Sequence, residues 1–193
     1  MQPVNLTFYT MNETIKNIFK ETVQCYNQIL SKYYPAHKSN GFTERNLTFN
    51  FSSCYRKAYP KSIIWQEACL AGREHIDTLV IDEENKAVIL IEAKRLQGEN
   101  KKESLLRDYE RITNKDININ GLADINSEDY SLYALMIFDV WVSKKTNEKD
   151  NRYKRLHEIL PKGETNYVEE VSFNKDWDMK ETYHLAYILK KLK

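Results

Sequence analysis

The 193-residue sequence is poor in the residues that mark linkers, disulfide frameworks and low-complexity segments. It contains only 5 Gly and 4 Pro, which leaves no flexible linker at which the chain would divide into two domains. Its three cysteines, Cys25, Cys54 and Cys69, are far apart and include no C-x-x-C pair. Neither a disulfide framework nor a zinc or iron–sulfur site is therefore expected. We expect a single domain of ordinary size over 1–193, in a reducing compartment.

An excess of charge of one sign is also missing, and so is any long apolar run. Lys and Arg total 29 while Asp and Glu total 28, so a polybasic coat is excluded, although a local basic patch is not. No stretch approaches the roughly 20 apolar residues that a membrane-spanning helix needs. The N-terminus lacks the basic-then-apolar layout of a signal peptide. The sequence thus predicts a cytoplasmic protein without a membrane partner.

The sequence does contain an alternation of helix-like and strand-like segments. Apolar residues recur at helical spacing in three long segments, 10–34, 44–59 and 99–113, and Thr43 is the expected N-cap of the second. Strand-like segments, rich in apolar and β-branched residues, are 62–68, 75–81, 87–91 and 133–142. Segment 87–91 is apolar at every position, as in a strand that is covered on both faces.

Two further helices are predicted in the last quarter of the chain, over 156–160 and 180–192. The order of elements indicates an α/β layered fold. Within it we expect an N-terminal helical part over 1–40, a core over 42–140 and a C-terminal helical part over 141–193.

The predicted hairpin brings two carboxylates and a lysine together. If its turn centres on Glu84 and Asn85, Asp77 stands opposite Glu92, and directly opposed residues in an antiparallel pair have Cβ atoms about 5 Å apart. Lys94 is two residues beyond Glu92 and therefore projects from the same face. Two carboxylates this close repel each other unless a positive charge lies between them, so the pattern indicates a cation site.

Mg²⁺, or Mn²⁺ in its place, suits such a patch because it prefers oxygen ligands and is commonly held by one or two carboxylates plus substrate phosphate. The backbone carbonyl of Ala93 is a further candidate ligand. A metal-bound water has a lowered pKa and can attack phosphorus, and Lys94 is placed to orient that water or to stabilise charge. A D…E-x-K match alone also arises by chance. Its position at the ends of two strands joined by a tight turn is what favours a functional site.

At this point the segment 76–94 resembles the signature of the PD-(D/E)XK nuclease superfamily. The resemblance lies in Ile76-Asp77, a short turn, and Glu92-Ala93-Lys94 at the end of an apolar strand. It implies a restriction-endonuclease-like fold with a central mixed β-sheet flanked by helices, and phosphodiester hydrolysis. It further implies that Asp77 and Glu92 are metal ligands and that Lys94 is the catalytic lysine. Ile76 stands where the signature has proline, a common departure.

Two more acids are candidates for an additional metal ligand. Glu44, at the start of the second predicted helix, resembles the first-helix glutamate that many members of the superfamily use, with a plain solvated helix residue as the alternative. Glu67, on the first predicted strand, is a rival for the same role. Downstream, Leu105 stands where some branches carry the Gln of a Q-L-x-x-Y motif, so the branch is left open.

Nucleic acid, and DNA in particular, is the expected partner. Arg95, Lys101 and Lys102 lie close to the E-x-K segment and are candidates for contacts with phosphates. The alternative is a non-catalytic nucleic-acid-binding module that keeps the nuclease fold, and a protein-interaction domain ranks third. A homodimer is compatible with the sequence because duplex-cutting enzymes of this size often use two sites.

Overall fold

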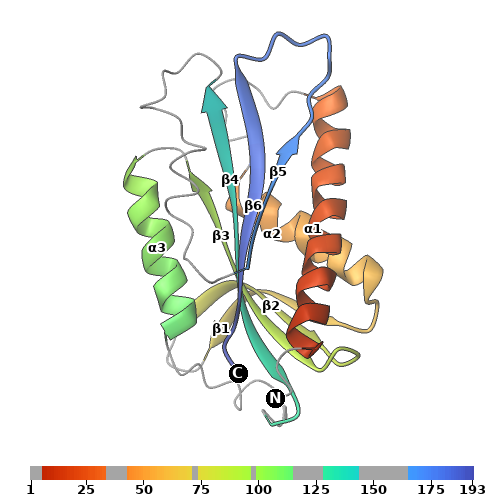
Figure 1. The fold of residues 1–193 in the computed structure, drawn as a ribbon, viewed down its shortest axis with the longest axis vertical. Coiled ribbons are helices and arrows are strands. Elements are labelled where there is room, and N and C mark those ends of the chain that lie inside the picture. The colour runs from red at the N-terminus through yellow and green to blue at the C-terminus, as the bar shows by residue number, and fades with distance from the viewer. Residues whose placement is uncertain (1–5, 34–42, 71–73, 97–98, 115–127, 144–164) are drawn as a thin grey trace.

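The computed structural model describes residues 6–33, 43–70, 74–96, 99–114, 128–143 and 165–193. These ranges contain three helices and six strands (Figure 1). In chain order the elements are α1 (Leu6–Lys32), α2 (Glu44–Ala58), β1 (Ile63–Leu70), β2 (Glu74–Asp82), β3 (Ala87–Leu96), α3 (Glu99–Asn114), β4 (Ser131–Ser143), β5 (Thr165–Val171) and β6 (Glu181–Lys191).

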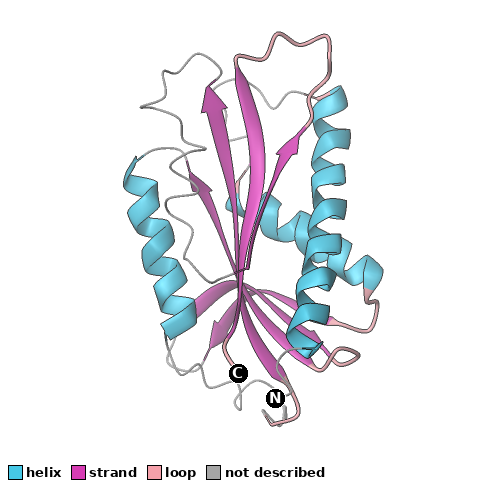
Figure 2. Cartoon of the chain, viewed as in Figure 1, coloured by secondary structure: helices cyan, strands magenta, loops and turns pink. Residues whose placement is uncertain are grey.

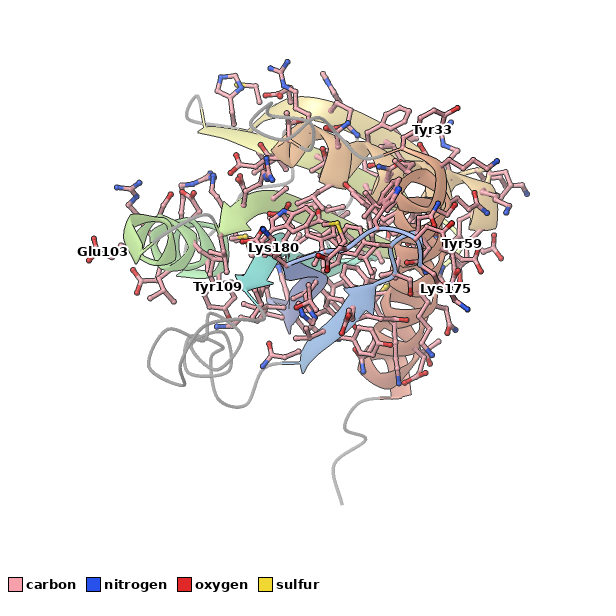
Figure 3. The ribbon with its side chains drawn as sticks, turned by 90° about the horizontal axis from the view of Figure 1, so that it is seen from above. Tyr33, Tyr59, Glu103, Tyr109, Lys175 and Lys180 are labelled. Carbon is pink, nitrogen blue, oxygen red and sulfur yellow. The ribbon has the colours of Figure 1, made fainter. Side chains whose placement is uncertain are left out.

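All six strands belong to one sheet, in the order β1-β2-β3-β4-β6-β5. β3 and β4 are parallel, and every other neighbouring pair is antiparallel. The fold is therefore α/β with a mixed sheet flanked by helices (Figure 2). A parallel pair needs a crossover connection, and here α3 lies between β3 and β4 in the chain. Seen from above, α3 lies across the sheet from α1 and α2, with Glu103 pointing outward (Figure 3).

The core consists of two apolar layers, one on each face of the sheet. Alternate residues of β3 and β4, such as Ile89 and Leu135, pack with α1 and α2. Their neighbours in sequence, such as Leu90 and Met136, pack with α3 on the opposite face. This two-sided burial explains why the central strands are apolar at consecutive positions.

The start of α2 is fixed by a capping box, as the sequence predicted for Thr43. The Thr43 hydroxyl accepts a hydrogen bond from the Asn46 N–H at 3.3 Å, and Asn46 Oδ1 accepts from the Thr43 N–H at 2.8 Å. Glu44 is consequently the first residue of the helix, at its positive end. None of the helices in the described part of the chain is both long and apolar enough to cross a membrane.

The β2–β3 hairpin has the register that the sequence indicated. Leu79 faces Leu90, and the last pair before the turn is Asp82 with Ala87. The buried Asp82 carboxylate holds the turn, accepting from the backbone N–H groups of Glu84 and Asn85 at 3.0 Å and from the Asn85 side chain at 2.7 Å. It also accepts from the hydroxyl of Tyr55 at 2.6 Å, which ties the turn to α2. The turn that sets the register is thus fastened to a helix across the core.

The helical C-terminal part expected over 141–193 is wrong for the described residues. Segment 181–191 is the strand β6, between β4 and β5, and Thr165–Val171 is the strand β5. In β6, Leu185 and Tyr187 pack in the layer of α1 and α2, while Ala186 and Ile188 pack in that of α3. A short continuous apolar run does not by itself distinguish a buried strand from a helix, and burial on both faces decides it here. The helix predicted over 156–160 lies outside the described residues.

We expect Asp82→Ala to lower the free energy of unfolding by about 2–4 kcal/mol, because it removes four hydrogen bonds and leaves the Tyr55 hydroxyl without its acceptor in the core. Urea denaturation measures this change. Glu83→Ala, at an exposed position in the same turn, is the matched control and should stay within about 0.5 kcal/mol of the parent. Equal effects of the two substitutions would show that Asp82 does not hold the turn.

Candidate active site

Asp77 lies where β2 parts from β3. The β2–β3 ladder ends at the pair of Thr78 and Ile91, whereas β3 continues alongside β4 as far as Leu96. Beyond the end of the ladder, Asp77 Oδ2 accepts a hydrogen bond from the Ala93 N–H at 2.8 Å. The Asp77 carboxylate therefore takes the place of a backbone acceptor and is held in the gap between two strands.

The inward–outward alternation of side chains is broken next to this gap. Ala68 and Ile76 pack in the same layer as Leu79, although strict alternation would place them on the other face. Between the pair of Gln66 with Thr78 and the pair of Ala68 with Ile76 stand Glu67 and Asp77. Glu67 has φ 52°, in the left-handed region that costs a non-glycine residue about 1 kcal/mol or more. The strained backbone of Glu67 thus lies beside Asp77, the first carboxylate of the site.

Glu92 is a buried acid whose surroundings disfavour its charge. It is 3% exposed, and its pKa is raised to about 7 by burial and by the negative charge of Asp77, with partial compensation from Arg111. The pKa of Asp77 is also raised, by burial above all, although its hydrogen bond from Ala93 acts in the opposite direction. The two acids are close enough to repel each other, as the hairpin register predicted, and both lack full compensation of their charge.

Lys94 lies on the same face of β3 and is surrounded by acids. Its ammonium is 2.9 Å from Asp108 Oδ2 on α3 and 3.8 Å from Glu44 Oε2 on α2. Burial lowers the pKa of Lys94, but the bond to Asp108 and the charges of Glu44 and Glu92 outweigh it, so the pKa is raised. Lys94 is therefore a positive charge fixed among carboxylates and not a neutral base.

Arg111 of α3 is a site residue that the sequence did not reveal. Its guanidinium donates a short hydrogen bond from Nη2 to Glu92 Oε1, and its Nη1 donates to the backbone carbonyl of His75 at 3.0 Å. Its Nε is also 3.8 Å from Asp108 Oδ1, one turn earlier on the same helix. The signal that would have found Arg111 and Asp108 is their position beside the apolar stripe of the helix predicted over 99–113, which must face the sheet.

The two candidates for an additional acid differ in their contacts. Glu44 accepts from the Arg95 N–H at 3.2 Å and contacts Lys94, so it lies within the cluster. Glu67 pairs with Arg45 at 3.5 Å, and both of their side chains are largely exposed. Both acids contribute to the raised pKa of Asp77. The structure therefore joins Glu44 to the site by direct contacts and places Glu67 at its rim.

The basic residues expected to contact phosphates, Arg95, Lys101 and Lys102, lie on different elements of the fold. Arg95 projects toward α1 and α2, where its Nε donates to Asp139 Oδ2 at 3.1 Å, so its side chain is engaged inside the protein. Asp139 also accepts from Tyr183, and burial raises its pKa to about 6. Lys101 and Lys102 belong to α3, but their side chains lie outside the described part of the structure.

Asp77 and Glu92 fit a Mg²⁺ ion in chemistry and in number. Among the described residues, Asp77 Oδ1 has no hydrogen-bond partner and Glu92 accepts through Oε1 alone. Two carboxylates are sufficient because Mg²⁺ usually retains several waters. No group of three His, Cys, Asp or Glu side chains in the described part of the chain is arranged to hold a metal ion. The protein contribution to such a site is therefore a pair of acids, with Glu44 nearby but bonded to Arg95.

Comparison of the chain with family models, with curated proteins and with solved structures gives no match. The site itself consists of a buried acid, Glu92, and a half-buried acid, Asp77, that repel each other, together with a fixed lysine and an arginine from the crossover helix.

The raised pKa of Glu92 leads to a prediction about stability in the absence of metal. The pKa is about 7 in the folded protein and 4.5 as the ordinary value. Between these pH values the folded state binds more protons than the unfolded state, so stability falls as pH rises through the window. Glu92→Gln has no charge to lose, and we expect it to be more stable than the parent at pH 8 by roughly 3 kcal/mol at most.

Urea denaturation in EDTA at pH 5 and pH 8 measures this difference, which should shrink at the lower pH. Glu110→Gln, at an exposed position on α3, is the control and should show no pH-dependent gain. A Glu92→Gln protein that is less stable than the parent at pH 8 would contradict the prediction.

Proposed function

We propose that the protein is a divalent-metal-dependent nuclease with a restriction-endonuclease-like fold, which hydrolyses phosphodiester bonds in DNA. The observation that carries the proposal is the convergence of Asp77, Glu92 and Lys94 at the place where β2 and β3 separate. The mixed sheet flanked by helices is the architecture that the PD-(D/E)XK resemblance implies. It supports the proposal without identifying the fold family.

In this proposal, Asp77 and Glu92 would hold Mg²⁺ or Mn²⁺. When bound, the ion would supply Lewis-acid stabilisation of the phosphoryl oxygens and would lower the pKa of water. The Ala93 carbonyl is a further ligand candidate, because the N–H and C=O of one strand residue point toward the same neighbouring strand. The Ala93 N–H already points to Asp77 across the gap, so its carbonyl is directed there as well.

Lys94 acts as a fixed positive charge in this mechanism. Its raised pKa keeps it protonated at neutral pH, so it donates hydrogen bonds and does not remove a proton. Asp108 and Glu44 hold the ammonium from two different helices. Positioned in this way, Lys94 orients the attacking water and stabilises the charge that develops on the phosphoryl oxygens.

We expect purified protein to cleave plasmid or oligonucleotide DNA in Mg²⁺ or Mn²⁺ but not in EDTA. Asp77→Asn and Lys94→Met should each reduce the rate by about 10²-fold or more, since each removes a group that acts on the reacting phosphate. Asp178→Asn and Lys175→Met, at exposed positions between β5 and β6, are matched controls and should retain the parent rate. Metal-dependent cleavage that survives both Asp77→Asn and Lys94→Met would place the active site elsewhere.

One observation favours the second candidate, a nucleic-acid-binding module that does not cut. Within the described residues, each acid of the cluster already has a basic side chain or an N–H group as its partner: Asp77, Glu92, Asp108 and Glu44. These contacts compensate part of the negative charge of the cluster without a metal ion. DNA binding that is equal in EDTA and in Mg²⁺, without cleavage, would favour this function over the first.

A further inference from the structure

Arg111 is a second positive charge in the site, beside Lys94, and the hydrolysis proposed above assigns it no role. It reaches from α3 to both strands that part at the gap, bonding Glu92 on β3 and the His75 carbonyl on β2. Its guanidinium therefore lies against one of the two acids that would hold the metal. A cation that binds Glu92 would therefore approach the carboxylate to which Arg111 is already bonded.

Arg111 and a divalent cation compete for the same carboxylate. Glu92 is buried and its Oε1 already accepts from Arg111, so a cation at Oε2 would lie on the same carboxylate. Two positive charges at neighbouring positions on one carboxylate repel each other, and burial reduces the screening of that repulsion. Cation binding at Glu92 therefore weakens its bond to Arg111.

Arg111 has a second acid within reach on its own helix. Its Nε is already 3.8 Å from Asp108 Oδ1, and its side chain is 27% exposed, so a small rotation toward Asp108 does not require α3 to move. In that position the planar guanidinium keeps N–H donors for another ligand. A guanidinium matches the oxygens of a phosphate with two parallel hydrogen bonds.

We propose that Arg111 is an exchangeable counter-ion. It pairs with Glu92 in the metal-free protein, yields Glu92 to a divalent cation, and then binds a non-bridging oxygen of the substrate phosphodiester while Asp108 holds it. This inference rests on the proposed function of the site. Phosphodiesters are then the ligand class of Arg111, and Arg111 binds the substrate only after Asp77 and Glu92 have bound the metal.

The metal half of the proposal is tested by titrating Mg²⁺ into the full chain at pH 8.5, followed by calorimetry and by the shift in unfolding temperature. Arg111→Met removes the competing charge and keeps an aliphatic side chain. We expect it to bind Mg²⁺ about tenfold more tightly than the parent, the equivalent of losing one hydrogen bond to a charged group. Arg107→Met, one turn earlier on α3 at an exposed position, removes the same charge and should match the parent.

Three more variants make the result specific. Asp77→Asn should abolish Mg²⁺ binding, which shows that the ion binds at this site. Arg111→Lys retains a competing charge and should bind Mg²⁺ close to the parent affinity. Arg111→Gln tests the same loss of charge with a polar side chain if Arg111→Met fails to fold.

The phosphate half is tested by the binding of a DNA duplex in Ca²⁺ as a function of salt concentration. We expect Arg111→Met to bind about tenfold more weakly, with the slope of log affinity against log salt reduced in magnitude by about 0.9, the value for one phosphate contact. Arg107→Met should keep the slope of the parent. Tighter metal binding together with weaker duplex binding in the same variant is the signature of the exchange, because a merely structural arginine would weaken both.

The outcomes separate the inference from the proposed function. If the parent binds Mg²⁺ through Asp77 but Arg111→Met binds it no more tightly, the exchange is overturned while the metal site stands. If Arg111→Met binds Mg²⁺ more tightly but keeps the duplex affinity of the parent, the phosphate role is overturned. If neither the parent nor any Arg111 variant binds Mg²⁺, both the exchange and the metal-dependent function are overturned.

Discussion

The hydrogen bond from the Ala93 N–H to the Asp77 carboxylate is the contact on which the arrangement of the site depends. An unpaired N–H buried in the sheet costs about as much as a lost hydrogen bond, so where β2 leaves β3 the chain must provide another acceptor. Asp77 provides it and is thereby fixed in the gap. The carboxylate that completes the sheet is the same one that faces Glu92. Asp77 consequently has a structural role in the sheet and, in the proposed function, a chemical role as well, and no single substitution separates the two completely.

The crossover helix supplies charged partners for two residues of the site, Arg111 for Glu92 and Asp108 for Lys94. Because β3 and β4 are parallel, the chain must return over one face of the sheet, and α3 does so over the face that carries Glu92 and Lys94. Asp108 and Arg111 are brought to the site by that return. The topology of the sheet thus determines which residues become partners of the hairpin, although they lie 14–19 positions further along the sequence.

The hairpin and its three charged residues were predictable from the sequence because a tight turn fixes the register and period-2 alternation fixes the face. Asp108 and Arg111 were not, since their contacts depend on the angle at which α3 crosses β3. The Arg95–Asp139 pair depends on the parallel register of β3 and β4, for which a helical crossover gives no local signal. The sequence over 180–192 predicts a helix, whereas the structure has the strand β6 there. The apolar run of β6 is buried on both faces, and this removes the alternation that identifies a half-exposed strand.

Several energetically unfavourable features lie together at the gap between β2 and β3. Their closeness helps to distinguish a functional site from a simple ion-pair network. The central strands are otherwise largely apolar on both faces, although the buried Asp139 on β4 also has a raised pKa and Lys86 in the hairpin turn also has a positive φ. At the gap stand a left-handed Glu67, two acids of raised pKa and an interrupted ladder. Replacing a buried ion pair by apolar residues is often neutral or stabilising, so the pairs of Glu92 and Lys94 are weak evidence for a purely structural role. The gap combines three such features, and this concentration supports the proposal that the site receives a cation. In the proposed function, the bond from Arg111 compensates part of the charge of Glu92 in the metal-free protein.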